Sequence, residues 1–422
     1  MQYEKHVLPN GLRLLTISDQ SLPTVTVMAL VEAGSKYERK EVNGISHFLE
    51  HMCFKGTTKR PGPRLIAEEL DSLGAQYNAF TGQEYTGYYA KVARGKEAKA
   101  LEIVTDLYQN PLFDEGEINR ERGVIIEEMN MYEDIPSRRV QDDILALMYG
   151  DQPAGWTILG ESAVIGRVTR EDFLHYRGEH YLPQSTIMVV AGACDPKAIC
   201  AQVEELTRSL PAGEKVAKVS VSTDQDTPRA TVRFKQSDQS HVVVGWHGYA
   251  LGDDRAYATR VLTTILGGTM SSRLWQKVRE ELGAAYYVRA SHDAYSDHGV
   301  FQISAGLDTD RLPLVLSAMI GEVCRLVKEG VTDEELTRAR DSITGTFVMG
   351  LERSDDLAEY YGLHEVVMGE MLAPEEFIAR INAVTKEECT TVAQEIFVNE
   401  HANCAIIGPH KDAEQFVPLL TL

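Results

Sequence analysis

Two segments of this chain each occur twice, and this internal repeat predicts two similar halves. The segment Leu73–Tyr77 (LGAQY) returns as Leu282–Tyr286 (LGAAY), at an offset of 209 residues. Each copy follows an amphipathic helical pattern, LIAEELDS in the first and SRLWQKVREE in the second. A second echo pairs FDEGEINRER, from Phe113, with VTDEELTRAR, from Val331, at an offset of 218 residues. Both offsets lie near half of the 422-residue chain and occur in the same order, which indicates a duplication.

Each half has the pattern of an α+β domain. Alternating apolar runs are typical of strands: TVTVMALVEAG, YNAFTGQEYTGYYAKV, STIMVVAGA, HVVVGWHGY and GVFQISAGL. Helical patterns lie between them, such as KEAKALEIVTDLYQN and RLPLVLSAMIGEVCRLVKEG. The segment from Leu210 to Pro228 is small, polar and flanked by prolines, as interdomain linkers are. We therefore expect a first domain at 1–210, a linker at 211–228 and a duplicated second domain at 229–422.

The most specific local motif is His47-Phe48-Leu49-Glu50-His51. With Asn43 as the expected N-cap, these residues begin a helix whose apolar face holds Ile45, Phe48, Leu49 and Met52. The histidines are one turn apart on the opposite face, so both can reach one metal ion. Glu50 lies beside them, where it can accept a proton from a metal-bound water. H-x-x-E-H is the pattern of inverted zinc peptidases; the alternative is a solvated helix face with two histidines.

A catalytic zinc usually has three protein ligands, and the segment 117–132 (EINRERGVIIEEMNMY) is the best source of the third. As a helix it buries Ile118, Ile125, Met129 and Tyr132. Glu121 and Glu128 flank this face almost two turns apart, whereas Glu127 points away. We predict Glu128 as the ligand and Glu121 as its neighbour. The alternative is a salt bridge from Glu128 to Arg120 or Arg122.

The second half of the chain lacks these groups. At the offset of 218, Glu121 corresponds to Ala339 and Glu128 to Thr346. The helix that matches the HFLEH segment reads DRAYATRVLTTILGG. We therefore expect one metal site per chain, in the first half.

Together these motifs resemble the pitrilysin-type (inverzincin) zinc metallopeptidases of about 420 residues, the group of the mitochondrial processing peptidase catalytic subunit and its bacterial relatives. The resemblance covers nearly the whole chain, from NGLRLL through NGISHFLEHMCFKGT, NAFTGQEYT and ERGVIIEEMNMYED to GGTMSSRLWQKVREELGAAY. In that family a glutamate ligand follows H-x-x-E-H after about 76 residues, and here 76 residues separate His51 from Glu128. The resemblance implies two homologous tandem domains, each a mostly antiparallel sheet packed with helices.

The resemblance also assigns roles to residues. It implies that His47, His51 and Glu128 bind one Zn²⁺ per chain, with Glu50 as general base and Glu121 as the additional glutamate. Arg279 and Tyr286 match the family's pair that holds substrate, although the residues alone favour structural roles. The family's substrate-binding edge strand matches Asn78, Ala79, Phe80 and Thr81, where an ordinary strand is equally consistent with the pattern.

These features imply a zinc endopeptidase that cleaves short, unfolded peptides inside a dimeric chamber. A homodimer is expected because the chain carries both the zinc motif and the Arg/Tyr pair; a heterodimer with a metal-free partner is the alternative. Processing of a specific precursor and a non-catalytic scaffold of the same fold are the competing functions.

Composition agrees with this class of protein. The formal charge of −21 excludes a general nucleic-acid binder, and an acidic interior would favour basic peptides. No apolar run approaches the ~20 residues of a membrane span. Six scattered cysteines without CxxC pairs indicate reduced thiols, and we expect a cytoplasmic protein.

Overall fold

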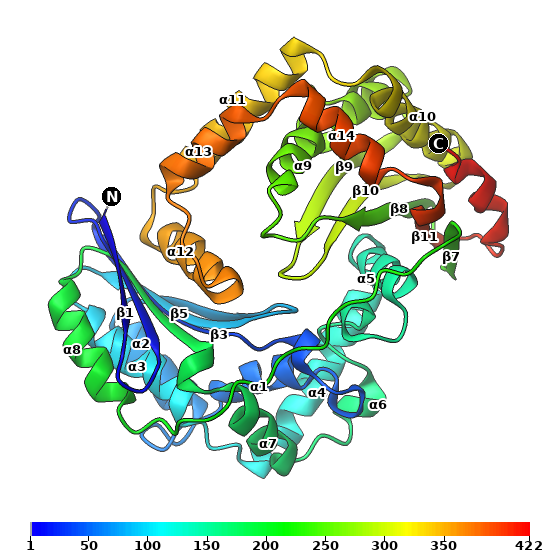
Figure 1. The fold of residues 1–422 in the computed structure, drawn as a ribbon. Coiled ribbons are helices and arrows are strands. Elements are labelled where there is room, and N and C mark those ends of the chain that lie inside the picture. Colours follow the sequence, from blue (N-terminus) through cyan, green and yellow to red (C-terminus); the bar gives the residue numbers. More distant parts are fainter. Residues whose placement is uncertain (1) are drawn as a thin grey trace. The chain divides into compact units, whose positions relative to one another are not determined.

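The structure, a computed structural model, describes residues 2–422 and contains two sheets (Figure 1). The first sheet has the strand order β1-β2-β6-β3-β5-β4. Only β2 and β6 pair in parallel; all other neighbours are antiparallel. Its strands are β1 Gln2–Val7, β2 Arg13–Ser18, β3 Thr24–Val31, β4 Gln76–Thr81, β5 Thr86–Ala93 and β6 Thr186–Gly192. β4 is therefore an edge strand.

The second sheet has the order β7-β11-β8-β10-β9, with β7 and β11 in parallel and the other pairs antiparallel. Its strands are β7 Arg229–Phe234, β8 Gln239–Gly248, β9 Ala285–Ala294, β10 Gly299–Asp308 and β11 Asn403–Gly408. Strand by strand, this order repeats the β2-β6-β3-β5-β4 part of the first sheet. The shared order and the single parallel pair in each sheet confirm the duplication, and the α+β prediction is confirmed.

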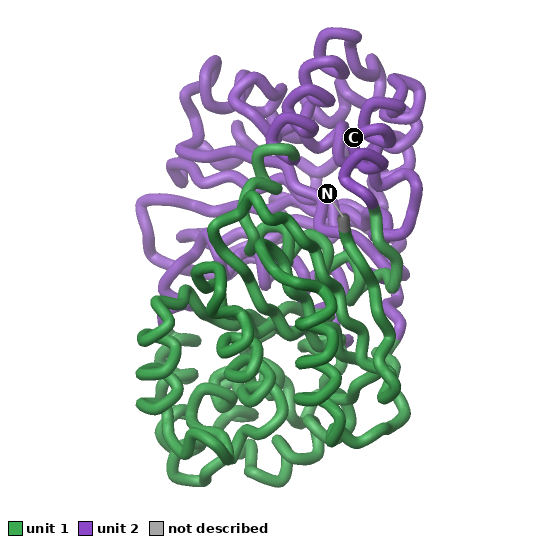
Figure 2. Tube along the Cα trace, turned by 90° about the vertical axis from the view of Figure 1, so that its left-hand side faces the viewer, with its two compact units in different colours: residues 1–130, 157–219, 348–372 green, residues 131–156, 220–347, 373–422 purple. Residues whose placement is uncertain are grey.

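The chain is divided into two compact units, each built around one sheet (Figure 2). Unit 1 comprises residues 1–130, 157–219 and 348–372, and unit 2 the remaining 131–156, 220–347 and 373–422. The segment 211–228 contains no helix or strand, and the division near its middle lies between residues 219 and 220. These units differ from the predicted domains at two short segments. Residues 131–156 lie in the first half of the sequence but belong to unit 2, and residues 348–372 lie in the second half but belong to unit 1.

The two exchanged segments, residues 131–156 and 348–372, each contain one helix, and these two helices occupy equivalent positions in the two copies of the repeat. Helices α4 (Glu115–Glu133) and α11 (Asp333–Met349) contain the two copies of the second sequence echo. Helix α5 (Pro136–Tyr149) follows α4, and helix α12 (Ser354–Met368) follows α11. α12 packs on β3 and β6 of unit 1, and α5 packs on β8 and β11 of unit 2. Each sheet is thus covered on one face by the helix that the other half supplies.

The opposite face of each sheet carries helices of its own half. In unit 1, α1 contacts β4, α3 contacts β3 and β5, and α8 contacts β2. The helices of this unit are α1 Ile45–Cys53, α2 Pro63–Ser72, α3 Glu97–Gln109, α6 Ser162–Ile165, α7 Arg170–His180, α8 Pro196–Thr207 and α12 Ser354–Met368. Those of unit 2 are α5 Pro136–Tyr149, α9 Arg255–Thr263, α10 Leu312–Glu329, α13 Pro374–Ala383 and α14 Lys386–Ile396. Two further helices, α4 Glu115–Glu133 and α11 Asp333–Met349, end in the neighbouring unit.

The central strands β3 and β6 are rich in β-branched residues, as is typical of strands that are covered on both faces. β3 is buried from Val25 to Val31 and β6 along its whole length. No helix among residues 2–422 combines the length and the apolar character that crossing a membrane requires. All six cysteines are free thiols, and four of them are buried.

Candidate metal centre

Helix α1, which carries the HFLEH motif, begins beneath a buried carboxyl group. Gly44 is the N-cap, with a left-handed φ of 97°, and makes no side-chain cap. Glu38 instead accepts hydrogen bonds from the backbone N–H groups of Gly44 and Ser46, at 2.7 and 2.8 Å. Asn43, the N-cap expected from the sequence, donates its side-chain amide to Glu38 at 2.7 Å. That expectation was wrong because an acidic side chain from outside the helix satisfies its first N–H groups.

The two faces of α1 divide as the periodicity predicts. Four apolar residues, Ile45, Phe48, Leu49 and Met52, are at most 1% exposed. His47 and His51 lie together on the other side, with ring centroids 4.6 Å apart. α1 also packs on β4, so the helix that carries both imidazoles lies against that edge strand.

Helix α4 places Glu128 opposite the two imidazoles. Ile118, Ile125 and Met129 are buried as predicted, whereas Glu127 is exposed. Tyr132 is only half-buried, in contrast to its prediction, because it lies at the end of the helix, where Arg138 stacks on its ring. The alternative salt bridges do not form: Arg120 pairs with Glu117, and Arg122 donates to Asn119 and two backbone carbonyls.

His47, His51 and Glu128 form a group with the composition of a catalytic zinc site. One donor atom from each residue lies within 4.8 Å of the other two. The Oε2 atom of Glu128 is 3.7 Å from Nε2 of His47 and 3.6 Å from Nε2 of His51. These distances are too long for hydrogen bonds but close to the ~3.4 Å that separates two ligands of a tetrahedral zinc ion. The donor set and its spacing therefore fit zinc, which these residues would hold.

The pKa values of the two imidazoles shift in opposite directions. Burial, aided by the neighbouring His51, lowers the pKa of His47 to about 3, so its ring is neutral at physiological pH. Burial acts on His51 in the same direction, but the hydrogen bond to Glu121 and the surrounding carboxylates raise its pKa overall. Nδ1 of His51 lies 2.9 Å from Oε1 of Glu121, which leaves Nε2 facing Glu128. Such a carboxylate–histidine pair fixes the tautomer that a metal ligand needs.

Glu121 is itself held by a residue that the sequence analysis did not single out. Lys55 Nζ lies 2.6 Å from Oε2 of Glu121. Burial favours the neutral acid, but the hydrogen bonds from His51 and Lys55 lower the pKa of Glu121 below its usual value. Lys55 lies four residues after His51, just beyond the C-terminal end of α1, and this spacing was the signal that the sequence offered.

Glu50 is positioned by the edge strand. Thr81 Oγ1 donates a hydrogen bond of 2.5 Å to Oε2 of Glu50. Burial raises the pKa of Glu50, against the effects of this hydrogen bond and of His51. A carboxylate with a raised pKa is a better proton acceptor, as a general base requires. Thr81, predicted from the resemblance as a substrate contact, thus has a structural link to Glu50 itself.

The other residues of that predicted contact, Asn78, Ala79 and Phe80, lie on β4 beside Thr81. Their backbone pairs with β5 on one side only, because β4 ends the sheet. The free side of the strand can pair with an extended chain. Their role in substrate binding stays a prediction.

Arg279 and Tyr286 belong to unit 2, whereas the candidate metal ligands belong to unit 1. Arg279 lies over the ring of Trp275 at 4.2 Å, in a helical segment at Trp275–Glu281. Tyr286 is 78% exposed on the edge strand β9. The structure therefore leaves Tyr286 available to a ligand, and the role of the pair stays a prediction.

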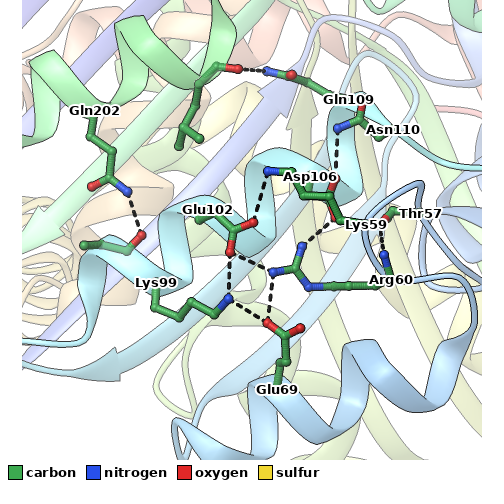
Figure 3. A network of polar contacts seen from close by, with 12 residues as sticks. Thr57, Lys59, Arg60, Glu69, Lys99, Glu102, Asp106, Gln109, Asn110 and Gln202 are labelled. Atoms are coloured by element: carbon green, nitrogen blue, oxygen red, sulfur yellow. Dashed lines mark hydrogen bonds and ion pairs between the residues drawn. The ribbon is translucent and has the colours of Figure 1, made fainter.

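The segment after α1 is anchored by a polar network around Arg60 (Figure 3). The Arg60 guanidinium, 3% exposed, binds Asp106 and Glu102 of α3 at 2.6 and 2.7 Å, and Glu69 of α2 at 2.9 Å. Thr57 adds a bond of 2.5 Å to Asp106. This network holds the chain that leaves α1 against α2 and α3, and so steadies the C-terminal end of the motif helix.

Comparison with protein families gives two matches that together cover most of the chain. Residues 13–162 match the family described as Insulinase (Peptidase family M16). Residues 167–343 match the family described as Peptidase M16 inactive domain. The first match contains His47, His51 and Glu128, and the second lies mostly in the half without the metal motif.

Individual relatives agree with these matches over nearly full length. A protein of Bacillus subtilis named uncharacterized zinc protease YmxG is 34% identical over 406 residues, 96% of this chain and 98% of that protein. A Rickettsia felis protein named uncharacterized zinc protease is 36% identical, over 96% of this chain and 97% of its own. A crystal structure of a protease from Helicobacter pylori has the same fold, with a TM-score of 0.91 at 22% identity, covering 97% of this chain and 99% of that one.

Proposed function

This chain belongs to the insulinase family of peptidases (peptidase family M16), and we propose that it is a zinc-dependent endopeptidase of short, unfolded peptides. The observation that carries the proposal is the group of His47, His51 and Glu128, with Glu50 beside it. The names of the relatives, which are zinc proteases, support the choice of metal. A zinc ion bound by these three residues supplies Lewis-acid activation of water and of the scissile carbonyl group.

The residues of the chain supply the remaining functions. Glu50 accepts the proton of the attacking water and passes it to the leaving amine, and Thr81 holds the carboxylate in place for both transfers. Glu121 orients His51 through Nδ1, and Lys55 keeps Glu121 charged. The four-residue spacing places the two histidines one helical turn apart, and the buried apolar face of α1 anchors the helix that carries them.

Substrate selection follows from the edge strand. An extended peptide that pairs with the free side of β4, at Asn78, Ala79, Phe80 and Thr81, gains main-chain hydrogen bonds independent of its sequence. Thr81 contacts Glu50, so such a peptide passes beside the general base. Most strand segments of a folded protein are already paired within its own sheets, whereas an unfolded peptide can pair along its whole length, which is why we propose unfolded peptides as substrates.

We further propose that two chains form a homodimer, in which Arg279 and Tyr286 of one chain contact substrate bound by the other. The exposure of Tyr286 supports this arrangement. Mixing Glu50→Gln with Tyr286→Ala tests it, because only a site shared between chains lets two weak variants restore activity. Activity no higher than the sum of the separate variants would contradict a shared site.

Two other functions compete with general peptide degradation. A precursor-processing peptidase would use the same metal centre with a stricter sequence preference. A scaffold of the same fold has no need of the grouped histidines and carboxylates, and their presence favours the enzyme.

Digestion of a mixed peptide set, with and without a chelator, tests the proposed function. We expect chelator-sensitive cleavage at internal bonds, restored by adding zinc, and no cleavage of a folded protein. Mass spectrometry of the products distinguishes broad degradation from cleavage at one sequence. Complete absence of cleavage by zinc-loaded protein would favour the scaffold.

A further inference from the structure

The two histidines of the candidate metal centre are held in different ways. Nδ1 of His51 bonds to Glu121, a side chain that orients the His51 ring. Nδ1 of His47 is buried and has no hydrogen-bond partner within residues 2–422. The direction of the His47 ring therefore depends on the backbone that carries it. This backbone is the first turn of α1, in which His47 is the third residue.

Glu38 holds this first turn of α1. The first N–H groups of a helix have no partner inside the helix, and a helix end without a cap frays. The Glu38 carboxylate accepts hydrogen bonds from the backbone N–H groups of Gly44 and Ser46, at 2.7 and 2.8 Å, and from the Ser46 hydroxyl at 2.6 Å. Its negative charge also lies at the helix end that the peptide dipoles make positive. Because Ser46 precedes His47, these bonds fix the backbone one residue before the imidazole.

The surroundings of Glu38 are themselves well packed. Glu38 is 5% exposed, and Asn43 donates a further hydrogen bond to its carboxylate at 2.7 Å. Tyr176 of α7, the helix that packs against α1 (Figure 1), lies with its hydroxyl 2.7 Å from the Ser46 hydroxyl. Water does not compete for these buried hydrogen bonds, so they hold the first turn in one arrangement.

The segment that precedes this glutamate is anchored to the end of the edge strand β4. Two backbone hydrogen bonds, of 3.3 and 2.8 Å, join residues 35–36 to residues 82–83. Gly34 lies so close to the same loop that a Cβ there would come within 2.3 Å of the Gly82 carbonyl oxygen. The loop directly follows Thr81, which binds the proposed general base. The carboxylate that caps α1 therefore belongs to a segment fixed against the other side of the site.

We propose that Glu38 is the positioning residue of His47, as Glu121 is of His51. The Glu38 carboxylate sets the first turn of α1 and thereby the direction from which His47 meets the metal ion. This inference rests on the proposed function, because it presumes zinc bound by His47, His51 and Glu128.

The zinc affinity of Glu38→Gln, measured by competition with a chromophoric chelator, tests this role. The amide keeps the size of the carboxyl group but replaces one acceptor oxygen with a donor, which cannot accept from the N–H groups of α1. We expect about tenfold weaker zinc binding. The absorption spectrum of the cobalt(II) protein, which reports ligand geometry, should change as well.

Both measurements are made at pH 8. Burial raises the pKa of Glu38 to about 7, so the wild-type carboxylate is mostly charged at this pH. Glu41→Gln is the matched control, because Glu41 is an exposed glutamate three residues further along the chain. Zinc affinity and a cobalt spectrum equal to those of the wild type in Glu38→Gln would overturn the proposal.

A double-mutant cycle separates this local role from a general loss of structure. In protein that carries His47→Ala, Glu38→Gln should change the residual zinc affinity by less than about twofold, because the side chain that it positions is gone. In protein that carries Glu121→Gln, the tenfold effect should persist, since Glu121 acts on His51. A tenfold effect in the absence of His47 would contradict the assigned role.

Ser46→Ala decides the question if Glu38→Gln does not fold, which circular dichroism shows. This variant removes the hydroxyl bond to Glu38 but keeps both backbone bonds. We expect about threefold weaker zinc binding. Unchanged zinc affinity of folded Ser46→Ala would then overturn the proposal.

Failure of this role is distinguishable from failure of the proposed function. If wild-type protein binds zinc and cleaves peptides in a chelator-sensitive way, and Glu38→Gln matches it, only the positioning role is overturned. Wild-type protein that binds no zinc overturns both.

Discussion

At the candidate metal centre, residue spacing in the sequence predicted some side-chain contacts and not others. The i, i+4 spacing of the histidines and the seven-residue spacing of Glu121 and Glu128 predicted which groups meet, because a helix converts spacing directly into direction. The bond between Thr81 and Glu50 was not predictable in this way. This hydrogen bond joins a strand and a helix, and the sequence patterns of the two elements do not predict which of their residues lie side by side.

Glu121→Gln should weaken zinc binding by about 10- to 100-fold, because the amide no longer offers His51 a charged acceptor. Competition with a chromophoric chelator measures the affinity. Glu127→Gln is the matched control, since Glu127 is exposed on the same helix. Equal affinity of both variants would contradict the orienting role of Glu121.

Among the secondary-structure elements, helix α1 is held in position by groups that lie outside the helix. Glu38 satisfies its first N–H groups, and the Arg60 network holds the segment that follows it. The amphipathic pattern predicted the helix and its buried face, but not Glu38 as the capping group. A capping residue within the adjoining sequence is the usual signal, and here that signal pointed to Asn43.

Arg60→Met should lower the free energy of unfolding by about 3–5 kcal/mol, because it leaves the buried Asp106 carboxylate without a cation, whereas Glu69 and Glu102 keep their ion pairs with Lys99. Urea unfolding of metal-free protein measures the change. Arg64→Met should change the free energy by less than about 0.5 kcal/mol, since the Arg64 side chain is 88% exposed. Similar losses in both variants would mean that the network contributes no more than a surface ion pair.

Helix α7 carries a group that links stability to pH. His180 is 4% exposed between the rings of Tyr37 and Tyr176, and burial lowers its pKa from 6.5 to about 4. Between pH 6.5 and 4 the unfolded chain therefore binds the proton that folded His180 excludes, so stability falls as the pH falls. The loss amounts to about 3 kcal/mol at most.

Metal-free wild-type protein should lose more stability than His180→Gln on acidification from pH 7 to pH 4. Urea titrations at each pH, in the presence of chelator, measure the difference. Parallel pH profiles for the two proteins would show that His180 is protonated in the folded state as readily as in the unfolded chain.

At the scale of the whole molecule, the repeat predicted two similar sheets, and the shared strand order confirms them. The exchange of α5 and α12 could not be predicted from the sequence, because hydrophobic periodicity indicates that a helix face is buried but not which sheet covers it. Leu357, Ala358 and Tyr361 of α12 contact the unit 1 sheet as they would in a helix of its own half.

A fragment of residues 1–219 should therefore be unstable by itself, although it contains the whole first sheet and the metal motif. The buried side chains of Leu357 and Val366 on α12 each stabilise unit 1 by about 1.5–3 kcal/mol, and the fragment lacks both. Circular dichroism during urea unfolding measures the loss. Cooperative unfolding of the fragment at the midpoint of the intact protein would contradict this assignment of α12.

In the proposed mechanism, Glu50 performs proton transfer at a zinc centre held by His47, His51 and Glu128. Cleavage of an internally quenched peptide by zinc-loaded Glu50→Gln, normalised to zinc content from metal analysis, tests it most directly. We predict about one zinc per chain and a loss of at least about 100-fold in rate, with Glu127→Gln unchanged. Full activity of Glu50→Gln at equal zinc content would exclude Glu50 as the general base.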